Sequence, residues 1–152
     1  MEVFSAVVTS LGIAANVSRG LWKLTNAWSD APRDVHWLRD DVARTHEFLA
    51  SVKYAIANGL PDQTWNESVN ELVPLIQRSE VLLTEINSIV TRIAEGRVPT
   101  VVKKQQAHDG IQPISARRRV VWMIKEVKMK KLRAAVIQNN AMIYGKLVAV
   151  NV

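Results

Sequence analysis

The stretch EVFSAVVTSLGIAANVSRGLWKLTNAW, residues 2–28, decides the fold that this chain can adopt. Its apolar and small residues recur at alternating steps of four and three, which is the spacing of one face of an α-helix. Such a helix needs other helices to cover that face, so the sequence predicts a helical bundle. The positions that form the stripe are Val3, Val7, Ser10, Ala14, Val17, Leu21, Leu24 and Trp28.

Two further helices with the same spacing are predicted in the first two thirds of the chain. One spans about residues 31–58 and is followed by Gly59-Leu60-Pro61, a glycine cap and a proline. The other spans about residues 64–95 and contains Pro74, which predicts a kink or a split. Their stripes are formed by Val35, Leu38, Val42, Thr45, Leu49, Val52 and Ile56, and by Trp65, Val69, Leu72, Ile76, Ser79, Leu83, Ile86, Val90 and Ile93.

A fourth helix is predicted over about residues 115–150, after a loop at 97–114 that has no sustained period. Two apolar faces can be drawn on it. We expect the first to be buried, with the second as its edge. The first contains Val120, Met123, Val127, Ala134, Ile137, Ala141, Tyr144 and Val148; the second contains Val121, Ile124, Leu132, Val136, Ile143 and Leu147. The prediction is therefore an all-α, single-domain four-helix bundle over residues 1–152.

The charge of the chain is distributed unevenly. Residues 1–99 hold 9 basic and 12 acidic side chains, whereas residues 100–152 hold 11 basic and 2 acidic ones. A basic C-terminal third suggests an anionic partner, which could be a lipid surface, a nucleic acid or an acidic protein. The chain has no cysteine, so disulfides, thiolate metal sites and a cysteine nucleophile are excluded.

The sequence offers no catalytic machinery. It contains no phosphate-binding loop, no serine-nucleophile motif and no zinc-protease motif. His36, His46 and His108 lack the spacing of metal ligands, and Asp40-Asp41 are neighbours on a helix that point in different directions and are expected to be solvated. We therefore expect a protein that is not an enzyme and needs neither cofactor nor metal.

The uncharged segment from Val3 to Ser18 has two compatible interpretations. It can be a core helix that its neighbours cover. It can also be a helix that leaves the bundle and enters lipid, although by itself it is shorter than the roughly 20 residues that span a bilayer. In the second interpretation the membrane-inserting residues are Val3, Phe4, Val7, Val8, Leu11, Ile13 and Val17.

The fourth helix is strongly basic over residues 117–133, which favours attraction to anionic lipid headgroups. A solvated face that keeps the domain soluble is the alternative. Nucleic acid ranks below lipid, because no base-reading motif is present. The lipid-steering candidates are Arg117, Arg118, Arg119, Lys125, Lys128, Lys130, Lys131 and Arg133.

The order and spacing of four segments resemble the HeLo-like and related N-terminal domains of fungal NLR-like (STAND) proteins. The opening segment pairs an acidic residue beside the initiator Met with an apolar helix rich in small residues. The second has a D-x-P-x-D entry before its helix, and the last has Lys-rich turns. The segments are MEVFSAVVTSLGIAANVSRGLWKL, SDAPRDVHWLRDDVARTHEFLASVKYAI, ESVNELVPLIQRSEVLLTEINSIV and RRRVVWMIKEVKMKKLRAAVIQNNAMIYGKLVAV.

This resemblance implies a cell-death or signalling domain of a fungal immune or incompatibility protein. Such a domain homo-oligomerises on activation, relocates from the cytoplasm to the plasma membrane and permeabilises it with its first helix. It works with a nucleotide-binding oligomerisation module in the same or a partner chain. The alternative is a helical adaptor that oligomerises or binds another helical domain without acting on membranes.

Overall fold

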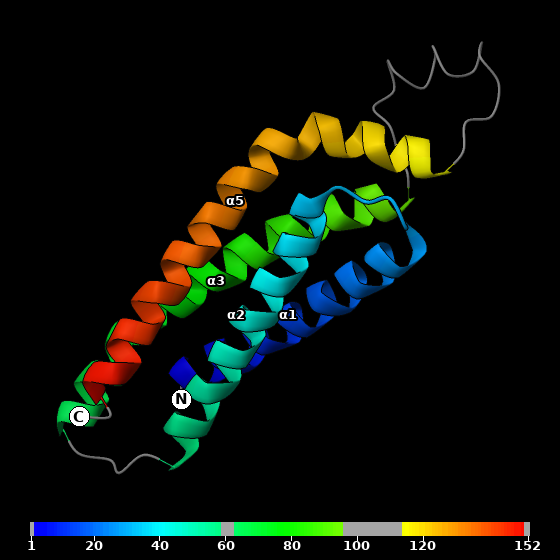
Figure 1. Cartoon of the computed structure of the whole chain (residues 1–152). Helices are drawn as coiled ribbons and strands as arrows, with labels where there is room; N and C mark the ends of the chain where they lie inside the picture. The colour runs from blue at the N-terminus through cyan, green and yellow to red at the C-terminus, as the bar shows by residue number, and fades with distance from the viewer. Residues whose placement is uncertain (1, 59–62, 96–113, 151–152) are drawn as a thin grey trace.

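Four helices run up and down in turn and form the bundle that the sequence predicts (Figure 1). The computed structural model describes residues 2–58, 63–95 and 114–150. The helices are α1 (Glu2–Ala27), α2 (Arg33–Asn58), α3 (Gln63–Glu95) and α5 (Ile114–Val150). Each begins and ends within two residues of its predicted limits. The predicted loop at 97–114 lies outside the described residues, apart from Ile114, which begins α5.

The stripes predicted for the first three helices are confirmed as the core, except at Trp65, whose side chain lies outside the described residues. Every predicted position of α1 is buried, from Val3 at 6% exposure to Leu21 at 0%. The same holds for Val35 to Val52 of α2 and for Val69 to Ile93 of α3, while Ile56 is half-buried against the core. Residues three or four positions apart lie on the same side of a helix. The periodicity of the sequence was therefore enough to predict the buried side of these three helices.

α3 passes through Pro74 as one continuous helix, so the predicted split does not occur. Just after the proline, two carbonyls of α3 accept hydrogen bonds from other helices. Ser10 Oγ of α1 donates to the Ile76 carbonyl at 3.3 Å, and Asn139 Nδ2 of α5 donates to the Leu75 carbonyl at 2.9 Å. These bonds attach α3 to a helix on either side of it.

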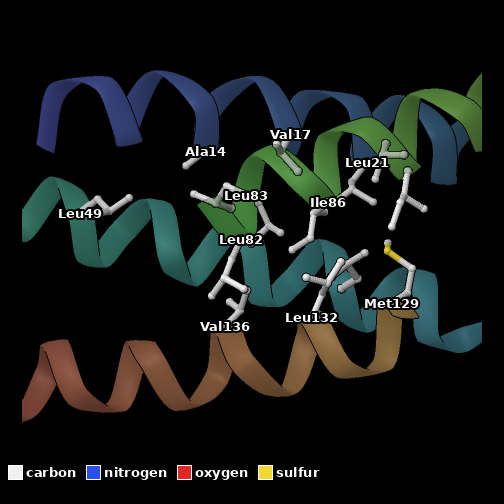
Figure 2. Packing of buried hydrophobic residues seen from close by; sticks show 14 of the residues in the cluster. Ala14, Val17, Leu21, Leu49, Leu82, Leu83, Ile86, Met129, Leu132 and Val136 are labelled. Carbon is white, nitrogen blue, oxygen red and sulfur yellow. The ribbon is translucent and has the colours of Figure 1, made fainter. Parts of the chain in front are cut away.

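α1 and α5 occupy opposite corners of the bundle, and each of them packs against both α2 and α3. Their buried side chains converge on the centre from opposite sides (Figure 2). Val17 and Leu21 descend from α1, Leu132 and Val136 rise from α5, and Ile86 of α3 lies between them. α3 therefore shares a large interface with both corner helices.

The predicted buried face of α5 is wrong. Met123, Val127 and Tyr144 are 67%, 67% and 57% exposed, and Ile137 and Val148 also face solvent. The face that enters the core is instead formed by Val121, Trp122, Met129, Leu132, Val136, Asn139, Asn140 and Ile143. Of the six residues predicted as the edge, Val121, Leu132, Val136 and Ile143 are thus core residues, Leu147 packs against the core in part, and Ile124 is exposed.

Candidate functional site

The uncharged residues of α1 do not share one environment. Val3, Val7 and Val17 are buried in the core. Leu11 and Ile13 are partly buried against it, whereas Phe4 and Val8 are 36% and 44% exposed. The predicted membrane-inserting set is therefore divided between the inner and outer sides of one helix, and only its outer members are accessible in the packed bundle.

α1 is held almost entirely by apolar contacts over Val3 to Leu21. In the described part of the chain, the hydrogen bond from Ser10 to the Ile76 carbonyl is the one polar bond from this segment to another helix. Further polar contacts gather at its C-terminal end. Arg39 of α2 lies 4.2 Å from the ring centroid of Trp22 and donates to Thr25 Oγ1 at 3.4 Å. The segment before Arg19 therefore depends on packing rather than on specific polar bonds.

α5 is attached in the opposite way, by polar bonds along its length. Asn139 donates to Ser79 Oγ at 2.7 Å and Asn140 donates to Thr45 Oγ1 at 2.9 Å. Near its C-terminal end, Lys146 Nζ lies 2.7 Å from a carboxylate oxygen of Glu71. α5 is therefore attached by buried hydrogen bonds with fixed geometry in addition to its apolar packing.

At least five of the eight predicted lipid-steering residues bind partners within the protein. Arg118 donates to the carbonyls of Ala94 and Ala27, while Arg119 pairs with Asp30 at 3.0 Å. The other contacts join Lys128 to Glu85, Lys130 to Glu126 and Asp34, and Arg133 to Asp41. The hydrogen bond of Lys130 to Glu126 raises the pKa of its ammonium group, and Asp34 adds to this effect.

The eight basic residues lie on all sides of α5 and do not form one patch. Arg118 and Arg133 lean toward the bundle, whereas Lys131 and Lys128 are exposed. Arg117 and Lys125 are partly buried. Consecutive residues of an α-helix are 100° apart, so Arg117, Arg118 and Arg119 already point in three different directions.

Asp41 is buried, although the sequence predicted a solvated face for Asp40-Asp41. Its side chain is 6% exposed and accepts a hydrogen bond from Arg133 Nε of α5. Asp40 is exposed and pairs with the neighbouring Arg39 at 3.2 Å. The guanidinium of Arg133 also lies 5.1 Å from the ring centroid of Trp37, so this arginine joins α2 to α5 twice.

A cleft of about 370 Å³ opens beside this ion pair, between the first half of α2 and the middle of α5. Its lining is mostly apolar and includes Trp37, Trp122, Met129, Ala134 and Ile137. The described residues contain no group of three or more acidic or histidine side chains that could hold a metal ion. Within the same residues, no helix has the length and apolar character that crossing a bilayer requires.

No protein-family model, curated protein or solved structure matches this chain. The resemblance to fungal HeLo-like domains therefore stays a prediction from the sequence.

Proposed function

We propose that this chain is a membrane-targeting signalling bundle of the cell-death type, which assembles and transfers α1 from its packed position to a lipid surface. The observation that carries the proposal is the contrast between the corner helices. Within the residues that the structure describes, apolar packing and a single hydrogen bond to α3 retain residues 3–21 of α1, whereas polar bonds attach α5 to both neighbours. An apolar interface can exchange protein for acyl chains without leaving polar groups unpaired.

As α1 leaves the bundle, contacts with lipid have to replace the packing of its apolar side chains in the core. Six apolar residues of α1 are buried, and exposing them to water would cost on the order of 10 kcal/mol. That is comparable to the whole stability of a typical domain, so α1 stays in place in solution. Hydrocarbon solvates the same side chains, and Phe4 and Val8 are already exposed for a first contact.

The uncharged stretch of α1 fits the interfacial zone of a membrane. Its length from Val3 to Ser18 is about 24 Å, less than the about 30 Å of a hydrocarbon core. We therefore propose that one copy lies in the plane of the membrane, and that permeabilisation requires several copies. The charge of +6 attracts the chain to an anionic cytoplasmic leaflet even though many individual cations are paired.

Vesicle binding tests this function directly. We expect the chain to sediment with vesicles of phosphatidylcholine and phosphatidylserine, more than with phosphatidylcholine alone, and to release a trapped dye. Val8→Glu should abolish binding, because a carboxylate at this exposed position faces the lipid while the bundle remains folded. The matched control is Val81→Glu on α3, whose side chain is 58% exposed. It should retain binding.

Two outcomes would contradict the proposal. One is the absence of vesicle binding even when a fused oligomerisation tag clusters the chain. The other is equal binding by Val8→Glu and the unmodified chain. Hydrogen exchange offers an independent check, because amides of α1 should lose protection when vesicles are added while those of α3 and α5 keep it.

A second candidate function is a helical adaptor that assembles without lipid. The exposed stripe of α5 favours it, since Met123, Val127 and Tyr144 face solvent at helix–helix spacing. A defined complex in plain buffer, with no response to vesicles, would select this function. A nucleotide-binding module in the same or a partner chain remains part of either proposal.

A further inference from the structure

The outward face of α5 carries a continuous stripe at the spacing of a coiled coil. We call it the outer stripe. Its large apolar members are strongly exposed, with Met123 and Val127 at 67% and Tyr144 at 57%. Alternating steps of four and three residues connect its positions, which is the pattern that brings one helix against another over many turns. The outer stripe consists of Met123, Val127, Lys130, Ala134, Ile137, Ala141, Tyr144 and Val148.

We propose that the outer stripe is the interface of a two-fold symmetric dimer, in which α5 of one copy packs antiparallel against α5 of a second copy. The symmetry axis passes between Ala135 and Val136. The proposal goes beyond the membrane function above and does not depend on it, because the dimer forms without lipid.

The stripe is complementary to itself in side-chain size in this register. The two-fold axis places Met123 opposite Val148, Val127 opposite Tyr144, Lys130 opposite Ala141 and Ala134 opposite Ile137. Each central pair therefore joins a long side chain to an alanine, and no two long side chains compete for the same space at the centre. An isologous interface requires this reciprocity, because every contact occurs twice.

Charge also selects the antiparallel orientation. Residues 117–133 of α5 hold eight basic side chains, whereas residues 134–150 hold Lys146 as their one charge. The antiparallel dimer lays the basic half of each helix against the nearly uncharged half of the other. A parallel dimer would place basic half on basic half and Lys130 on Lys130, which repels. In the monomer, Lys130 already leans aside toward Glu126 and Asp34.

The cleft between α2 and α5 supplies a receptor for the partner. Ala134 and Ile137 belong both to the outer stripe and to the lining of this cleft, together with Trp37, which is 43% exposed. The small Ala134 leaves room at the cleft edge where the second copy presents its Ile137. An apolar side chain that fills a neighbouring hollow is the usual centre of a stable interface.

The stripe is long enough for a stable pair. Met123 to Val148 span about 37 Å along the helix. A helix pair of that length, with the flanking side chains of α2, buries on the order of 1,200 Å² in total, which is at the lower limit of specific interfaces. We therefore expect a dimer at micromolar concentrations rather than an obligate one.

Engineered cysteines test the register, since the chain contains none of its own. Met123→Cys and Val148→Cys are prepared as two separate proteins. Either variant alone should form little disulfide-linked dimer, because its two copies of the cysteine lie about 37 Å apart along the axis. An oxidised mixture of the two should give a strong cross-linked species. Cross-linking of each variant by itself, without gain on mixing, would overturn the antiparallel arrangement.

Sedimentation equilibrium in plain buffer tests the dimer itself. We expect twice the 17.0 kDa mass of the chain. Ile137→Glu should weaken the dimer by about tenfold or more, because the carboxylate enters the centre of the interface. Ile137 is 47% exposed in the monomer, so the fold should tolerate the change, and circular dichroism verifies this. A strictly monomeric chain, or an equally strong Ile137→Glu dimer, would overturn the proposal.

Val8→Glu on α1 serves as the reciprocal control, since Val8 lies on the opposite corner of the bundle and is 44% exposed. It should dimerise normally while losing vesicle binding. Ile137→Glu should bind vesicles while losing dimerisation. Failure of the dimer and failure of the membrane function are thus separate results of the same pair of variants.

Discussion

Replacement of Arg133 by methionine is expected to lower the free energy of unfolding by about 3 kcal/mol. Methionine keeps much of the length and apolar stem of the arginine but removes the cation that Asp41 faces. The Asp41 side chain is only 6% exposed, so its carboxylate is left without a partner in a site that water hardly reaches. Arg133 itself is 31% exposed, which places the loss at the lower end of the range for buried pairs. Urea denaturation followed by circular dichroism measures it.

A double-mutant cycle separates the ion pair from the packing of Arg133. Asp41→Asn in the Arg133→Met background removes the unpaired charge, so the double variant should recover a substantial part of the loss. Exposed Asp40 gives the matched control, because Asp40→Asn should change stability by less than about 0.5 kcal/mol. A stability change of that small size for Arg133→Met would show that the pair contributes little to the fold.

The periodicity of the sequence was sufficient for α1, α2 and α3 but not for α5. α1 also has apolar residues outside its stripe, but the stripe predicted for it was the buried one, whereas on α5 the wrong one of two apolar faces was predicted to be buried. The side that enters the core contains Asn139 and Asn140, and these two polar residues interrupt its apolar pattern. One signal was present, because Thr45 and Ser79 occupied predicted core stripes. Each hydroxyl donates to a carbonyl of its own helix, and its oxygen remains free to accept a bond from one of these two asparagines.

The candidate sites were likewise predictable only in part from the sequence. An uncharged segment is visible in the sequence, and so is the density of positive charge on the fourth helix. What the sequence does not reveal is pairing across helices. Asp41 and Arg133 are 92 residues apart. The helical period places Asp41 beside the buried stripe of α2 and Asp40 on the opposite side, but it does not identify the partner of Asp41. The outer stripe is a different case. The heptad spacing of these α5 residues is visible in the sequence, but the residues face solvent and not the core.

Leu21→Ala is expected to weaken the folded bundle by about 3 kcal/mol and, under our proposal, to increase vesicle binding. Leu21 is fully buried where α1 meets the core. It lies outside the uncharged stretch, so the part of α1 that enters lipid is unchanged. Truncation leaves a cavity in the packed bundle, but fluid acyl chains close around an alanine without one. The packed state of α1 is therefore penalised more than the lipid-bound state. Urea denaturation and vesicle sedimentation measure the two effects.

The informative comparison is with Leu132→Ala on α5. Leu132 is 7% exposed, and its loss should destabilise the bundle by a similar amount. α5 packs on α2 and α3 at the corner opposite α1, so this cavity leaves the contacts of α1 intact. If α1 is the element that transfers to lipid, Leu21→Ala binds vesicles more strongly and Leu132→Ala does not. Equal enhancement by both variants would mean that vesicles capture the globally unfolded chain. In that case the apolar attachment of α1 would be a property of the core and not of the function.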